Sequence, residues 1–142
     1  MSSQDRAWAD AAHQGNLAEI AAGKMAGSKG TSASIKDAGK MLVTDHTRLD
    51  HALVQATGAM SRTLPTRPSA EQRATAKQLT AKHGAAFDGA FVTTEIAAHK
   101  KTINMTRKEV AQGRSGKLRA AARSALPVLK KHLSRLQKLQ GD

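Results

Sequence analysis

Apolar residues near the C-terminus recur at alternating intervals of four and three residues. The positions are Leu118, Ala122, Ala125, Leu129, His132, Leu136 and Leu139. This spacing places one stripe along one side of an α-helix, as in helices that pack in bundles. The pattern predicts a helix over residues 116–140, and His132 is the polar member of its buried stripe.

Two other segments repeat this spacing, and each again contains one histidine. One stripe consists of Ile35, Ala38, Leu42, His46, Leu49, Leu53 and Ala56. The other consists of Val92, Ile96, His99, Ile103, Thr106 and Val110, and Phe87 and Phe91 widen it. We expect helices over residues 33–59 and 86–112. A less regular face of small residues, with Glu19 at its edge, predicts a further helix over residues 4–26.

The connections complete the predicted fold. Glycines with nearby serines or threonines mark turns at residues 27–32 and 113–116, and two prolines mark a longer connection at 61–68. Ser69 and Gln72 form a capping box that predicts a short surface helix over residues 70–83, ended by Gly84. Pro127 frees the carbonyl group of Arg123 and predicts a kink in the last helix.

Strand patterns are absent, which makes the predicted fold all-α. Four long helices with mostly short connections predict an antiparallel up-down four-helix bundle. One extra short helix lies between the second and third long helices. A length of 142 residues suits a single domain over residues 1–142.

Composition excludes several kinds of site. The chain has no cysteine, which excludes disulfides and thiolate metal ligands. No run of about 18 apolar residues occurs, so we expect no transmembrane segment. No signal peptide is visible at the start of the chain, as expected for a mature exported protein and equally for a cytoplasmic one.

The formal net charge is +12, and after position 100 only Glu109 and Asp142 oppose the basic residues. The last predicted helix carries an outer basic face, formed by Arg119, Arg123, Lys130, Lys131, Arg135 and Lys138. Such a face suits phosphate groups of nucleic acid or anionic lipid. Nucleic acid is the less favoured partner because aromatic residues for base stacking are scarce. The alternative is a solvated face without a partner.

Four short segments resemble a bacterial family of unknown function, number 4142, whose members are often described as predicted outer membrane proteins. They are LAEI (17–20), MLVTDHT (41–47), AFDGAF (86–91) and LPVLKKHL (126–133). Their order and spacing cover the chain from about position 10 to 139. The resemblance implies a ferritin-like four-helix bundle exported to the periplasm or envelope, and it implies no established activity.

The three stripe histidines form the main candidate site. His46, His99 and His132 each lie near mid-helix, and an offset of two or three residues is less than one turn at about 1.5 Å per residue. We expect the three imidazoles to meet in the core, joined by Glu19. Glu95 and Asp45 are secondary candidate ligands. Three histidines and a carboxylate suit a divalent ion such as zinc or copper.

A buried polar layer without metal is the alternative, because buried histidines also pair with carboxylates or carbonyl groups. A di-iron site is disfavoured, since no Glu-x-x-His motif occurs. Hydrolase and nucleotide-binding motifs are also absent. We therefore expect a non-enzymatic, exported, envelope- or stress-associated binding protein with a core metal site. A basic module that binds anionic partners is the alternative function.

Overall fold

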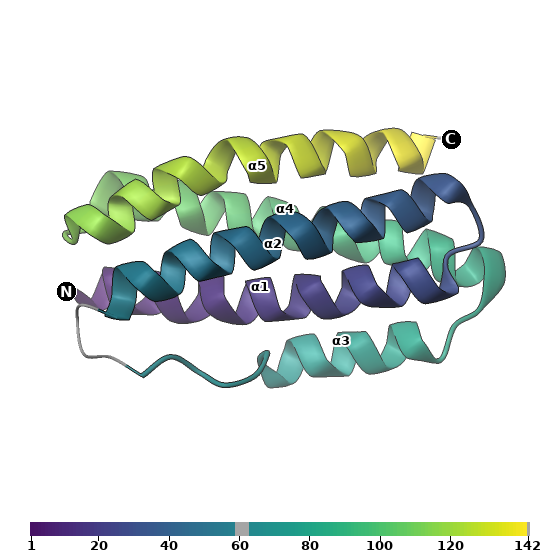
Figure 1. Ribbon diagram of the computed structural model, residues 1–142, viewed down its shortest axis with the longest axis horizontal. Helices are drawn as coiled ribbons and strands as arrows, with labels where there is room; N and C mark the ends of the chain where they lie inside the picture. Colours follow the sequence, from purple (N-terminus) through teal and green to yellow (C-terminus); the bar gives the residue numbers. More distant parts are fainter. Residues whose placement is uncertain (59–62, 142) are drawn as a thin grey trace.

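The regular structure of the chain is entirely helical in the computed structural model, which describes residues 1–58 and 63–141. The helices are α1 (Ser3–Lys29), α2 (Ala33–Gly58), α3 (Ala70–Thr80), α4 (Gly84–Gln112) and α5 (Gly116–Gly141) (Figure 1). This confirms the all-α prediction and the short helix between the second and third long ones. The predicted end of the second helix, at position 59, lies outside the described residues.

Two glycines behave differently from the prediction. Helix α1 continues past Gly27 to Lys29, and the N–H of Gly30 then donates to the carbonyl oxygen of Ala26. Gly84 does not end the short helix, which stops at Thr80; it begins α4 with a φ of 58°. That left-handed backbone angle suits glycine, and it turns the chain from α3 into α4.

The four long helices pack so that each contacts two others. Helix α1 lies against α2 and α4, and α5 also lies against α2 and α4. Neighbours run in opposite directions, whereas the diagonal helices α2 and α4 run in the same direction (Figure 1). In the up-down order predicted from the sequence, α4 would run opposite to α2. Here the connection that contains α3 returns along the bundle before α4 begins.

A short contact between glycines fixes the distance between α1 and α2. A Cβ atom placed on Gly23 would lie 2.5 Å from the carbonyl oxygen of Gly39, and the reverse contact has the same length. Only residues without a Cβ permit such a close approach of two helix backbones. The crossing therefore brings α1 and α2 close together in the halves that adjoin the turn between them.

Two apolar clusters fill the core on either side of a polar layer. The larger comprises Ala22, Ala26, Ile35, Ala38, Leu42, Leu79, Phe87, Phe91, Val92, Ile96 and Leu136. The smaller comprises Trp8, Ala9, Ala12, Leu53, Leu118 and Ala122. Helix α3 packs on the outside of α1 and α4 and contributes Leu79 to the larger cluster.

A second buried polar cluster joins the start of α1 to the α4–α5 turn. The Asp5 carboxylate accepts hydrogen bonds from the backbone N–H groups of Ser2 (2.7 Å), Arg114 (2.9 Å) and Ser115 (3.1 Å). Burial raises the pKa of Asp5, but hydrogen bonds with the Ser2 and Ser115 backbone N–H groups, the Glu109 side chain and the Ser2 hydroxyl outweigh it and hold the pKa below its usual range. This cluster therefore anchors the N-terminus to a distant turn.

Helix α5 contains Pro127 without interruption, and Figure 1 shows its first half sloping relative to its second half. The bend agrees with the missing N–H of proline and its steric conflict with the preceding turn. Among the described residues, none of the helices combines the length and the hydropathy that crossing a bilayer requires.

Candidate metal centre

Three buried histidines from three helices meet in the polar layer. His46 on α2, His99 on α4 and His132 on α5 are 2%, 1% and 0% exposed. Their ring centroids lie 5.5 Å (46–99), 5.2 Å (46–132) and 5.3 Å (99–132) apart. The structure thus places the three rings in a nearly equilateral triangle inside the bundle.

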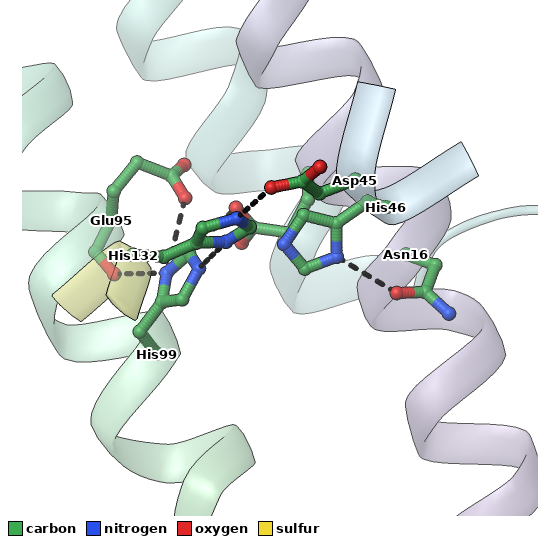
Figure 2. A network of polar contacts seen from close by, with 7 residues as sticks. Asn16, Asp45, His46, Glu95, His99 and His132 are labelled. Carbon is green, nitrogen blue, oxygen red and sulfur yellow. Dashed lines mark hydrogen bonds and ion pairs between the residues drawn. The ribbon is translucent and has the colours of Figure 1, made fainter. Parts of the chain in front are cut away.

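Each ring has one nitrogen bonded to an acceptor outside the triangle (Figure 2). His99 Nδ1 lies 2.8 Å from the backbone carbonyl oxygen of Glu95. His46 Nδ1 lies 2.8 Å from Asn16 Oδ1, and His132 Nε2 lies 2.7 Å from Asp45 Oδ2. An acceptor partner requires these three nitrogens to carry the hydrogen, which assigns the tautomer of each ring.

The remaining nitrogens then carry lone pairs that face the middle of the triangle. His46 Nε2 is buried without a hydrogen-bond partner. His99 Nε2 and His132 Nδ1 lie 3.2 Å apart, and neither has a hydrogen to donate in this arrangement. The neutral triangle therefore holds three acceptors and no donor, which is an arrangement that a cation between them would satisfy.

The pKa values favour neutral rings. Burial lowers the pKa of His46 to about 2, and the repulsion that protonated His99 and His132 would exert lowers it further. Burial also lowers the pKa of His99 to about 4, although its bond to the Glu95 carbonyl opposes this. Burial lowers the pKa of His132 despite its contact with Asp45. Neutral imidazole is the form that binds metals.

The geometry fits a small divalent ion. Nitrogen ligands of zinc lie about 2.0–2.1 Å from the metal, which puts two ligating nitrogens about 3.3 Å apart in a tetrahedral site. The observed 3.2 Å between His99 Nε2 and His132 Nδ1 matches this. Ligand atoms of all three histidines lie within 4.8 Å of one another.

Glu19 and Glu95 lie on the other side of His99. Glu19 Oε2 is 3.9 Å and Glu95 Oε2 is 3.8 Å from His99 Nδ1, the nitrogen that faces away from His132. The sequence placed Glu19 among the three imidazoles; the structure groups Glu19 with Glu95 and His99 instead. Asp45, a secondary candidate, bonds to the outer nitrogen of His132.

The two glutamates form a buried carboxyl pair. Burial raises the pKa of Glu19 well above its usual range, and the adjacent Glu95 raises it further. Burial also raises the pKa of Glu95, with hydrogen bonding to Glu19 opposing the shift. Oε2 of each side chain has no hydrogen-bond partner. Both pKa shifts favour the protonated forms of these two carboxyl groups, which lie next to His99.

The sequence did not reveal Asn16 as part of the site. Its Nδ2 donates to Asp50 Oδ1 (3.3 Å), which orients Oδ1 toward His46. His13 Nδ1 lies 2.7 Å from the same carboxylate oxygen, and only 12% of its side chain is exposed. One signal was available: Asn16 precedes Glu19 by three residues, which places both on one helix face.

The predicted basic face of α5 lies away from this centre. Arg123, Lys130, Lys131, Arg135 and Lys138 are exposed, and Arg119 is half-buried. Arg119 donates to the carbonyl oxygen of Val110, and Arg135 donates to the sulfur of Met41. The other side chains of this face point to solvent, so the face is separate from the histidine layer.

The fold and the site define a helical-bundle protein with a histidine- and carboxylate-rich polar layer in its core. The chain belongs to the family described as "Domain of unknown function (DUF4142)", whose sequence profile matches residues 1–139. Searches of curated proteins and of solved structures returned no match.

Proposed function

We propose that this chain is a ferritin-like bundle protein that binds one divalent metal ion, zinc or copper, through His46, His99 and His132. The inner nitrogens of the three rings are the ligands. The observation that carries the proposal is the convergence of three lone pairs, each fixed by an acceptor on the opposite ring nitrogen. Outer acceptors of this kind orient histidine ligands in metal sites and make them more basic.

A polar layer without a cation explains the contacts less well. If His132 turned its hydrogen toward His99, its Nε2 would carry a lone pair facing Asp45 Oδ2 at 2.7 Å. If it kept the hydrogen toward Asp45, two lone pairs would face each other at 3.2 Å. Either neutral state leaves one contact a proton short, and burial lowers the pKa of His132, which disfavours the doubly protonated ring that would fill both contacts. A metal ion removes the conflict for all three rings together.

Zinc and copper fit the donor set best. Three imidazole nitrogens are borderline ligands that both ions accept, and a three-histidine site leaves one coordination position open. A di-iron centre needs bridging carboxylates and Glu-x-x-His pairs, and the chain has no such pair. The single long connection through α3 supports ferritin-like connectivity, since that class has one crossover.

Metal titration of untagged, chelator-treated protein tests the proposal. We expect about one zinc or copper ion per chain, and a rise in melting temperature on addition of either ion. His99→Ala removes a ligand and is expected to abolish that rise. His51→Ala is the matched control because His51 is an exposed histidine on α2.

An unchanged metal response in His99→Ala would overturn the named site. If the wild-type protein ignores both ions, the layer is structural, and salt-dependent binding to anionic vesicles or nucleic acid through the basic face becomes the next hypothesis. The envelope location stays a prediction from the family resemblance, and fractionation of cells that produce the protein tests it.

A further inference from the structure

A cavity of about 470 Å³ opens beside the histidine triangle. Side chains of α1, α2, α4 and α5 line it, and its walls are mostly small and apolar. They include Ala12, Ala52, Ala56, Ala121 and Ala125. The volume lies in the range of about 300–1,000 Å³ that is typical of small-molecule sites. Alanine-rich stretches that could have packed tightly instead leave room.

Polar groups with unused bonding capacity lie at the buried end of this cavity. His46, His99, Glu19 and Asn16 line it there, and none is more than 8% exposed. His46 Nε2 and Glu19 Oε2 have no hydrogen-bond partner. A ligand that enters the cavity therefore reaches His46 and His99, two of the three proposed metal ligands.

The charge of the cavity favours an anion. Lys117 and Gln55 are exposed lining residues, which places the opening between α2 and α5. Within the part of the chain that the structure describes, Glu19 is the one acidic residue of the lining, and Lys117 is its one lysine or arginine. An ion at the histidines would add positive charge at the inner end. With such an ion bound, the positive charges of Lys117 and the ion outweigh the single carboxyl group of Glu19, which favours an anionic head group.

From these features, we infer that the cavity binds a small aliphatic carboxylate. Its carboxylate group takes the open position on the ion held by His46, His99 and His132, and its alkyl chain lies along the alanine walls. This inference rests on the proposed metal site. It names the ligand class that the site takes, because the buried end is polar and the rest of the cavity is apolar.

Octanoate and acetate are the probes that separate the head group from the chain. Protein loaded with cobalt(II) in place of zinc is titrated with each salt, and the visible absorption bands of the metal are followed. Each buried methylene strengthens binding about fourfold. We expect octanoate to bind at least about tenfold more tightly than acetate, and to shift the cobalt bands.

Ala125→Leu is the diagnostic variant because its larger side chain fills part of the cavity. We expect octanoate binding to weaken at least about tenfold, while acetate binding and metal affinity stay unchanged. Ala97→Leu is the matched control, since Ala97 is exposed on α4 and outside the cavity. Circular dichroism checks that both variants fold.

The outcomes separate the two proposals. Stoichiometric cobalt with equal affinity for octanoate and acetate leaves the metal site standing and overturns the carboxylate site. The carboxylate site is also overturned if Ala125→Leu binds octanoate as the wild type does, or if octanoate binds equally well to metal-free protein. Absence of metal binding overturns both proposals.

Discussion

Two sets of buried carboxyl groups, Asp5 and the Glu19–Glu95 pair, differ in how fully their hydrogen bonds are satisfied, although Oε1 of Glu109 beside Asp5 also has no partner. Asp5 accepts hydrogen bonds from three backbone N–H groups and from the Ser2 hydroxyl. In the central layer, by contrast, one oxygen each of Glu19 and Glu95 and one nitrogen of His46 have no partner. A satisfied cluster stabilises the fold, whereas an unsatisfied one lowers stability unless a ligand completes it. We therefore interpret the Asp5 cluster as a structural anchor and the central layer as a ligand-binding site.

Removing the Asp5 carboxylate, which anchors the start of α1 to the α4–α5 turn, should have the largest effect on stability. In Asp5→Ala the N–H groups of Arg114 and Ser115 lose their acceptor, and α1 loses part of its capping box. We expect a loss of about 4 kcal/mol in the free energy of unfolding, measured by urea denaturation. Asp37→Ala, at an exposed position of α2, should change it by less than about 0.5 kcal/mol.

Metal affinity should not change in Asp5→Ala, since the anchor is distant from the histidines. Similar losses of stability in the two aspartate variants would show that the Asp5 cluster is not an anchor.

Glu109 makes the anchor pH-sensitive. Burial raises its pKa to about 7, and hydrogen bonding with Asp5 raises it too. Because the pKa of Glu109 is raised in the folded state, its protonated carboxyl group contributes its full stabilisation below the unfolded-state pKa of 4.5. That stabilisation is lost as the pH rises through 7. As the pH rises from 5 to 7.5, the free energy of unfolding of Glu109→Gln should therefore increase by about 2.5 kcal/mol relative to that of wild type.

Urea denaturation at both pH values measures this gain. Glu71→Gln, at an exposed position of α3, is the control and should show no such dependence. A constant difference between Glu109→Gln and wild type would mean that Glu109 ionises without a penalty in the folded protein.

The histidine layer should respond to pH in the opposite direction. The pKa of His99 is about 4 in the folded protein against 6.5 for the free side chain. Its neutral form stabilises the fold above pH 6.5, and this stability is lost as the pH falls toward 4. Between pH 7 and pH 5, metal-free wild type should lose about 2 kcal/mol more than metal-free His99→Gln.

Thermal unfolding in the presence of a chelator, converted to free energies, makes this comparison. His51→Gln should behave as wild type does, because His51 is exposed. Equal acid sensitivity of His99→Gln and wild type would indicate that the pKa of His99 is the same in the folded and unfolded states.

Glu95→Gln tests the unsatisfied carboxyl pair and should have the smallest effect. Its amide mimics the protonated carboxyl group that burial favours. We expect metal-free Glu95→Gln to be about 1 kcal/mol more stable than wild type at pH 8, with the gain shrinking toward pH 4. Urea denaturation at both pH values provides the measurement. A loss of stability at pH 8 would show that the ionised pair is already compensated.

The sequence predicted the helices because their apolar stripes are local and periodic. It also put His46, His99 and His132 on the buried faces, since each occupies a stripe position. It could not show on which side of His99 the Glu19 carboxylate lies, because that depends on the rotation of α1 relative to α4. The role of Asp5 was equally hidden, since its partners Arg114 and Ser115 are more than 100 positions away.

The course of the chain between α2 and α4 shows a different limit. Ser69 and Gln72 predicted the start of α3, and the structure confirms their capping box. Nothing local indicates that this segment returns along the bundle. Its direction depends on the packing of α3 against α1 and α4, and on Leu79 in the larger apolar cluster.

That long connection also shapes how the molecule assembles. It divides the chain into two helical hairpins, α1–α2 and α4–α5, each closed by a tight turn and each able to form from contacts close in sequence. His46 belongs to the first hairpin, and His99 and His132 belong to the second. The triangle therefore forms only after the two hairpins dock. An ion bound by histidines of both hairpins would slow their separation.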